Sequence, residues 1–271
     1  MGARAGELRA RGKKVALIST LGAVHAGHQA LIRAAVAAGQ AAVVTIFAHP
    51  LQLGPNETAA RYLAQLPADL PLCEAAGADT VFAPALDEVY PRGYGSFVTE
   101  ETISKRLCGI SRPNYFRGVT TFTAYLFNLI RPHALYFGQK TIQRAAVVRR
   151  MAEELGFEGE VVVVPTVREP DGLAAGTDNK DLSPNQRKAA LALVKALNQV
   201  KDMVGAGVIS PDRLIAEATH ILGQYRQVRV IYVAMVDPAT LEAVREVVPG
   251  RCLAAIAAWV DELRLIDNVL L

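Results

Sequence analysis

The sequence predicts an α/β protein with a doubly wound parallel sheet, followed by a small α+β domain. Short apolar stretches alternate with longer segments of helical pattern over the first two-thirds of the 271 residues. Strands that are apolar throughout are typical of a parallel sheet with helices on both faces. The pattern changes near residue 180, where two Ser-Pro pairs precede helical segments and β-type stretches follow.

The first part of the chain is expected to supply the strands and helices of the parallel sheet. Gly39 and Gly77 are expected to end its first two helices. Ligands of such folds bind beyond the carboxyl ends of the strands, so the loops after the strands are the candidate site. Strands are expected at residues 15–19, 42–47, 80–83, 134–137 and 160–164, and helices at 29–38, 59–76, 120–130 and 142–155.

The second part follows a loop at residues 166–181, which we interpret as a hinge. Ser183-Pro184 is expected to open a helix that runs to about residue 204, and Ser210-Pro211 a second helix to about residue 222. We therefore predict two domains, residues 1–180 and residues 181–271. Strands of the second domain are expected at 228–236, 252–260 and 263–266.

Composition and charge exclude several classes of protein. With 51% hydrophobic residues and a net charge of only +3, the chain is not expected to be disordered. The sequence contains no run of about 20 apolar residues, the length needed to span a membrane. Its densest basic stretch, at residues 9–14, is too small for a nucleic-acid surface. Three widely separated cysteines form neither a disulfide framework nor a metal-ligand pattern. We therefore expect no metal held by the protein. We also expect a cytoplasmic protein, since no secretory signal is visible.

The strongest candidate for chemistry is the segment Leu21-Gly22-Ala23-Val24-His25-Ala26-Gly27-His28, between the first strand and the first helix. The N–H groups and the positive dipole end at a helix start favour an anion there. Two imidazoles on one side of the opening turn can donate hydrogen bonds to a phosphate. The alternative is that one histidine caps the helix and the other packs against it.

Other loops at strand ends carry further candidates. Lys140, which follows Gly138 after the fourth strand, suits a phosphate, although a lysine in such a place is more often solvated. His49 and Gln52 follow the second strand, and Arg117 could face the same site or cap a surface helix. Neither a P-loop nor a GxGxxG fingerprint occurs, so these groups indicate a nucleotide bound in another way.

Together these segments resemble the pantothenate synthetase (pantoate–β-alanine ligase) family of the HIGH-type nucleotidyltransferase superfamily. The resemblance runs from residue 15 to residue 271. It implies a Rossmann-like first domain, a small C-terminal lid domain and a homodimer. The matched blocks include Pro50-Leu51-Gln52, Gly54-Pro55-Asn56-Glu57, Phe116-Arg117-Gly118-Val119, Phe137-Gly138-Gln139-Lys140, residues 164–174 and residues 264–271.

The resemblance also implies a reaction, in which Mg²⁺ and ATP are used to adenylate a small hydroxy acid and an amine then displaces AMP. By position, His28 matches the general acid, His25 its partner and Lys140 a phosphate-binding lysine. The acid would be held by Gln52, His49 and Arg144. The nucleotide would also contact Leu21, Gly22, Gly138, the backbone of Val167, Gly176 and Thr177.

The chain departs from the family pattern at several of these positions. The usual Met-Ser-Ser-Arg-Asn loop reads Ala175-Gly176-Thr177-Asp178-Asn179, so an anion replaces a phosphate-binding cation. Three hypotheses follow. Because of these departures, the first is a ligase with altered substrates, in which Arg144 pairs a second anionic group. The others are an authentic pantoate–β-alanine ligase and a catalytically silent paralogue that binds a ligand or partner. Further departures are Thr141 for aspartate, Arg144 for glutamine, His49 for asparagine and Leu21 for methionine.

Overall fold

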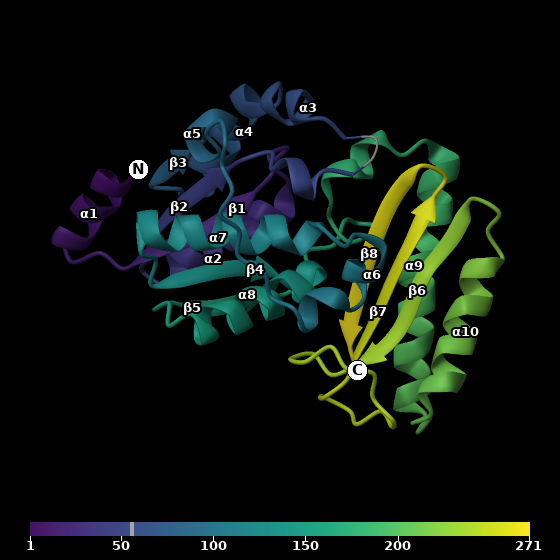
Figure 1. Cartoon of the computed structure of the whole chain (residues 1–271). Coiled ribbons are helices and arrows are strands. Elements are labelled where there is room, and N and C mark those ends of the chain that lie inside the picture. Colours follow the sequence, from purple (N-terminus) through teal and green to yellow (C-terminus); the bar gives the residue numbers. More distant parts are fainter. Residues whose placement is uncertain (55–56) are drawn as a thin grey trace. The chain divides into compact units, whose positions relative to one another are not determined.

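The computed structural model describes residues 1–54 and 57–271 of the chain (Figure 1). Pro55 and Asn56, part of one matched block, lie outside the described residues. The chain forms two compact units, Met1–Ser104 with Arg112–Pro165, and Lys105–Ser111 with Thr166–Leu271. The change of unit after residue 165 comes at the start of the loop interpreted as a hinge, and a boundary at residue 180 stays a prediction.

The first unit is built on a parallel sheet whose strand order, among the described residues, is β3-β2-β1-β4-β5. The chain adds β2 and β3 on one side of β1, and then β4 and β5 on the other. The topological switch point therefore lies between β1 and β4. This confirms the predicted doubly wound α/β fold. The strands are β1 (Val15–Thr20), β2 (Ala41–Ile46), β3 (Thr80–Phe82), β4 (Ala134–Gly138) and β5 (Glu160–Val164).

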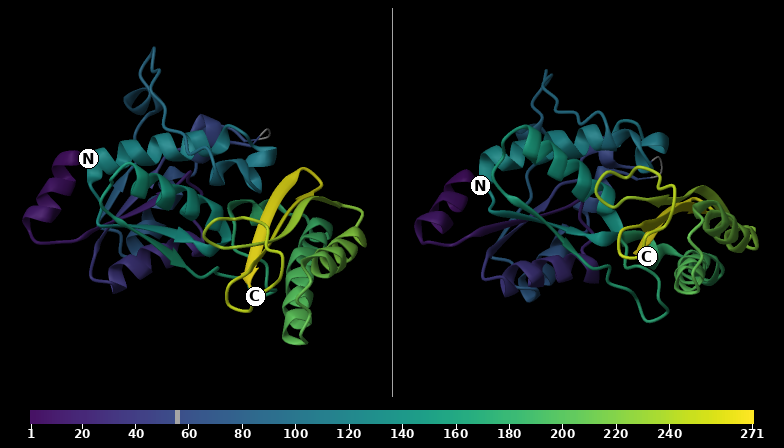
Figure 2. Two further views of the ribbon diagram at one scale, coloured as in Figure 1. Left: turned by 60° about the horizontal axis from the view of Figure 1, so that its bottom comes forward. Right: turned by 90° about the horizontal axis from the view of Figure 1, so that it is seen from below.

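Helices cover both faces of this sheet (Figure 2). Ala16, Ile18 and Val44 face α2 and α4 in one apolar cluster, and α7 and α8 cover the other face. The described part of the first unit contains the helices α1 (Gly2–Ala10), α2 (Ala26–Ala37), α3 (Ala59–Leu63), α4 (Leu66–Ala75), α5 (Leu86–Val89), α7 (Tyr115–Ile130) and α8 (Ile142–Glu154). The 3₁₀ turns within residues 1–54 and 57–271 are η1 (Pro50–Gln52), η2 (Ile103–Lys105), η3 (Gln139–Thr141) and η4 (Thr177–Asp181).

One predicted helix is wrong as a single element. The segment 59–76 forms two helices, and α4 begins beside Pro67. A proline ring disfavours helical conformation in the preceding residue and removes a backbone N–H, so the helix restarts there. The break also turns α4 onto the edge of the sheet where the candidate site lies, since Asp69 reaches the loop after β1.

Helix α7 begins at Tyr115, earlier than the expected residue 120. Gly118 lowers the helical propensity of this first turn, yet the helix forms because Gly118 packs closely on the loop after β2. A Cβ atom at this position would lie 2.9 Å from the Cε1 atom of His49 and 2.9 Å from the Cβ atom of Leu51. Only glycine permits this approach of α7 to η1.

The second unit, all of whose residues are described, is the small α+β domain that the sequence predicts. Its antiparallel sheet has the order β6-β7-β8, and α9 and α10 pack on it through Leu193, Leu214 and Ile256. Ser183 and Ser210 cap these two helices as expected. The elements are α6 (Cys108–Ser111), α9 (Pro184–Gly205), α10 (Pro211–Gly223), β6 (Val228–Val236), β7 (Leu253–Val260) and β8 (Leu263–Leu270).

Strand β8 continues to Leu270, beyond the expected residue 266. The strand runs on through the polar residues Asp267 and Asn268. Asp267 is buried and its carboxylate accepts two hydrogen bonds from the Arg168 guanidinium, at 2.8 and 3.1 Å. A buried carboxylate is tolerated when it is paired in this way. Among the described residues, no helix is both long and apolar enough to cross a bilayer.

Candidate active site

The candidate site lies at the switch point of the parallel sheet. Strand β1 leads through Leu21 and Gly22 into α2, and β4 leads through Gly138 into η3 and α8. Because β1 and β4 are hydrogen-bonded neighbours, with Ala16 opposite Ala134, their two following loops emerge side by side. The fold therefore brings the histidine loop next to the loop of Lys140, at the edge where ligands of such sheets bind.

His25 caps the first turn of α2. Its Nδ1 atom accepts a hydrogen bond from the Gly27 N–H at 3.0 Å. This pattern assigns the ring proton of the neutral imidazole to Nε2, which makes Nε2 the donor. The capping role was the alternative interpretation of this histidine, and it is compatible with hydrogen-bond donation from the other side of the ring.

His28 lies beside His25, with the two ring centres 4.0 Å apart. Its Nδ1 atom faces the His25 N–H at 3.4 Å, and its Nε2 atom lies 3.1 Å from the hydroxyl oxygen of Thr20. Thr20 also accepts a hydrogen bond from the Gly22 N–H at 3.1 Å. His28 is thus connected to both ends of the loop that carries it.

The pKa of His28 lies well below 6.5, chiefly because the imidazole is buried. The nearby charges of His25, Arg144 and Lys140 lower it further. His28 is therefore neutral at physiological pH. An anion that enters the site would raise the pKa of His28 again, because negative charge favours the protonated imidazole.

Lys140 and Arg144 supply positive charge on the neighbouring loop and helix. Lys140 is in η3, and Arg144 follows one turn later in α8. The Arg144 guanidinium lies 6.0 Å from the ring centre of Phe137, and its Nε atom is buried without a hydrogen-bond partner. A buried donor without a partner is uncommon in proteins. Together with the imidazoles, these groups form a site suited to an anion.

The loop after β2 holds Gln52 and His49, which are 4% and 3% exposed. The backbone carbonyl of Gln52 accepts a hydrogen bond from Arg112 at 2.7 Å. Both ring nitrogens of His49 have protein partners, since Nδ1 accepts from the Leu51 N–H at 3.1 Å and Nε2 lies 2.7 Å from the Tyr90 hydroxyl. His49 is therefore engaged in shaping the turn that carries Gln52. The acid-binding role of both residues stays a prediction.

Burial lowers the pKa of His49 to about 4. The unfolded chain, with a histidine pKa near 6.5, binds this proton at higher pH than the folded chain does. We therefore expect the free energy of unfolding to fall as the pH decreases from about 6.5 to about 4, by about 3 kcal/mol from His49. Urea unfolding at pH 6.5 and pH 4.5 measures the loss.

The matched variant is His49→Asn. The asparagine oxygen can replace Nδ1 as the acceptor for Leu51, but the side chain does not titrate in this range. The variant should lose less stability than the wild type between the two pH values. Equal losses in the two proteins would contradict the assignment to His49.

The remaining residues that were predicted to contact the nucleotide, Val167, Gly176 and Thr177, lie in the second unit. Val167 accepts a backbone hydrogen bond from Ala175 at 2.9 Å, and Gly176 precedes η4, whose first turn contains Thr177 and Asp178. Asn179 anchors this turn by donating to the Ala174 carbonyl at 3.0 Å. The loop is thus ordered within its own unit, and its part in nucleotide binding stays a prediction.

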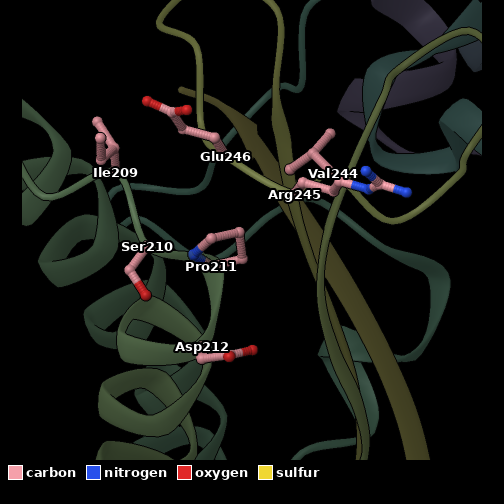
Figure 3. A pocket seen from close by; sticks show the side chains of 7 residues that line it. All are labelled: Ile209, Ser210, Pro211, Asp212, Val244, Arg245 and Glu246. Carbon is pink, nitrogen blue, oxygen red and sulfur yellow. The ribbon is translucent and has the colours of Figure 1, made fainter.

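A surface pocket of about 470 Å³ also lies in the second unit (Figure 3). Its lining includes Asp212, Glu246 and Arg245, and the Arg245 side chain extends away from Glu246. None of the predicted site residues lines this pocket, so we assign it no role in the reaction. The full lining is Ile209, Ser210, Pro211, Asp212, Val244, Arg245 and Glu246.

Several residues that contact the predicted site were missed from the sequence. Thr20 contacts His28, Tyr90 contacts His49, and the Asp69 carboxylate accepts hydrogen bonds from the loop before His25. A weak signal existed for Asp69, an acidic residue in the apolar segment Leu66–Ala75. The sequence left open whether Arg117 faces the site or caps a surface helix. Its guanidinium stacks on Phe97, 3.7 Å from the ring centre.

Comparisons with known proteins identify the family of this chain. Residues 1–270 match the family model described as pantoate-beta-alanine ligase. A pantothenate synthetase of Moorella thermoacetica is 44% identical over 263 residues, which cover 97% of this chain and 93% of that protein. The crystal structure of pantothenate synthetase from Thermus thermophilus has a TM-score of 0.90 at 39% identity, covering 98% of this chain and 97% of that chain.

A more distant match shows the shared fold. It is the crystal structure of pantoate-beta-alanine ligase from Francisella tularensis complexed with beta-gamma ATP and beta-alanine. Its TM-score is 0.73 at 23% identity, over 99% of this chain and 95% of that chain. With a family model that spans the chain and relatives above 40% identity, the chain belongs to the pantoate-beta-alanine ligase family of AMP-forming ligases.

Proposed function

We propose that this chain is an authentic pantoate–β-alanine ligase. The observation that carries the proposal is the cluster of His25, His28, Lys140 and Arg144 at the switch point, in a chain that matches this family from end to end. Relatives at 40–44% identity are pantothenate synthetases. These matches favour the authentic activity over our first hypothesis of altered substrates.

In the first step, a carboxylate oxygen of pantoate attacks the α-phosphorus of ATP. A new P–O bond forms, the bond to the bridging oxygen of the β-phosphate breaks, and pyrophosphate leaves with the bonding electrons. Lys140 and the imidazoles of His25 and His28 would stabilise the negative charge that develops on the phosphates. Gln52 and Arg144 would hold the acid in line for attack.

Mg²⁺ would accompany ATP and neutralise part of its phosphate charge. Among the described residues, no group of three or more His, Cys, Asp and Glu side chains could hold a metal ion. Mg²⁺ in proteins is commonly held through substrate phosphates and only one or two carboxylates, so the ion would arrive with the nucleotide.

In the second step, the neutral amine of β-alanine attacks the carbonyl carbon of the acyl-adenylate. A C–N bond forms, the C–O bond to AMP breaks with its electron pair on the phosphate oxygen of AMP, and the amine releases one proton to the solvent. The histidine and lysine groups that favoured the first leaving group would also stabilise the phosphate of departing AMP. The homodimer and the cytoplasmic location that we expected stay predictions.

The test is a reaction with ATP, Mg²⁺, pantoate and β-alanine, with AMP, pyrophosphate and pantothenate measured by chromatography. We expect the three products in equal amounts. If pantoate is inert and another hydroxy acid gives AMP, the altered-substrate hypothesis is correct instead. If no acid–amine pair gives AMP and calorimetry detects no ATP binding, the chain is a silent paralogue.

Arg144→Gln tests which group of the acid this position recognises. If Arg144 pairs a carboxylate, it should favour acids with a second carboxylate, such as malate, over pantoate. Loss of one charge-assisted pair is expected to shift the ratio of kcat/KM towards pantoate by about tenfold. Steady-state rates with each acid give the ratio.

The matched control for this variant is Arg150→Gln. Arg150 lies on the same helix, where it pairs with the exposed Glu154. Its replacement should leave the ratio for the two acids unchanged. An unchanged ratio in Arg144→Gln itself would refute the assignment of Arg144 to the acid.

A further inference from the structure

We infer that Asp69 is a positioning residue for both histidines. Its carboxylate, carried by α4, fills the backbone turn between β1 and α2 and thereby sets where His25 and His28 stand. The inference rests on the proposed function for its effect on the rate, whereas the placement of the rings can be tested without any reaction.

Asp69 accepts hydrogen bonds from two consecutive backbone groups. Oδ2 accepts a hydrogen bond from the Ala23 N–H at 2.8 Å, and Oδ1 accepts one from the Val24 N–H at 2.7 Å. Gly22 and Ala23 both have positive φ angles, +116° and +52°. Backbone N–H groups in such a turn converge on one point and form a concave anion site. Here the anion is a side chain of the protein itself.

The conformation of Ala23 is unfavourable for a residue with a Cβ atom, so the surrounding structure must hold it. Asp69 is 2% exposed, and a buried carboxylate strongly favours keeping its hydrogen-bond donors. Gly22 also packs against this group, since a Cβ atom there would lie 3.4 Å from Oδ2. The turn is therefore held to α4 rather than by its own conformational preference.

The held turn connects directly to both imidazoles. On one side, the Gly22 N–H contacts the Thr20 hydroxyl, which lies 3.1 Å from Nε2 of His28. On the other side, Val24 precedes His25, whose N–H faces Nδ1 of His28. A shift of the turn would move both rings, and displacements near 1 Å can cost about 100-fold in rate.

The test is Asp69→Asn in the full chain. The asparagine amide offers one oxygen acceptor, and its NH₂ group would meet a backbone N–H, so one of the two bonds is lost. We expect kcat to fall about 10- to 100-fold while KM for β-alanine changes less than about threefold. The ¹⁵N NMR signals of the His25 and His28 rings, recorded without substrates, should both shift.

Asp237→Asn is the matched control. Oδ1 of Asp237 accepts hydrogen bonds from the Ala239 and Thr240 N–H groups, both at 2.8 Å, in a turn of the second unit. Its replacement should lower the melting temperature without changing kcat or the two histidine signals. If Asp69→Asn does not fold, Asp69→Glu takes its place, since it keeps the charge but displaces the carboxylate. The same changes in kcat and in the two histidine signals are expected.

A folded Asp69 variant with wild-type kcat and unshifted histidine signals would overturn the inference. So would a loss of kcat no larger than that of Asp237→Asn. If the wild-type chain makes no pantothenate, the proposed function fails by itself. The NMR comparison then still decides whether Asp69 places the rings.

Discussion

Replacing His28 by alanine is expected to lower kcat by about 10²- to 10⁴-fold, the range for loss of a group that donates or transfers a proton in the transition state. The His28 ring contacts the Thr20 hydroxyl, the His25 backbone and the His25 ring. Alanine removes the donor and these contacts together. Initial rates of AMP formation at saturating substrates measure the effect.

His220→Ala provides the control for this variant, because His220 is an exposed residue of α10. It should have the wild-type kcat. A His28→Ala protein with unchanged activity would remove His28 from the mechanism. A loss of activity with unchanged melting temperature would place the effect in the chemistry rather than in folding.

Lys140→Ala is expected to lower kcat/KM for ATP by about 10²- to 10³-fold, as for removal of one preorganised group that stabilises a developing anion. The positive charge of Lys140 contributes to the low pKa of His28. The same variant should therefore raise the pKa of His28 towards 6.5. Steady-state kinetics and an NMR titration of the histidine rings measure the two effects separately.

Two further variants complete this experiment. Lys140→Arg keeps the charge but changes its shape, and it should recover part of the loss. Lys201→Ala, at an exposed position of α9, should change neither quantity. If kcat/KM is unaffected in Lys140→Ala while the pKa of His28 rises, Lys140 is near the ring but does not bind the phosphates.

Much of the fold could be predicted because its signals are local. Apolar strands such as Val15–Thr20 and the Ser-Pro pairs at Ser183 and Ser210 define their own elements. Local signals also marked His25, His28 and Lys140 as candidate residues, because each follows a predicted strand, and their roles stay predictions. The parallel pairing of β1 with β4 then brings these loops together.

The groups that support the site could not be predicted in the same way. Asp69 contacts Ala23 and Val24 from 46 and 45 residues away, and Tyr90 contacts His49 from 41 residues away. Such pairs depend on how α4 and the segment after α5 pack against the loops. No sequence period or turn signal encodes that packing. The break in the 59–76 helix at Pro67 had a local signal, although the apolar pattern around it was stronger.

Single residues and the whole chain point to different functions. Asp178, Thr141 and Arg144 suggested altered substrates, since each changes charge or hydrogen-bonding type. The match over residues 1–270 and the 44% identity to a pantothenate synthetase favour the authentic reaction. A phosphate site draws on several cations and backbone groups, so the change of one of them can be compensated by the others.

Gly118 has a consequence for engineering a more heat-resistant form of this protein. A helical glycine is a usual target for replacement by alanine, which gains up to about 1 kcal/mol of helical propensity. At this position the added methyl group would lie 2.9 Å from both His49 and Leu51. A procedure that scores helices one by one would select this replacement, and the displaced residues would be those that shape the turn of Gln52.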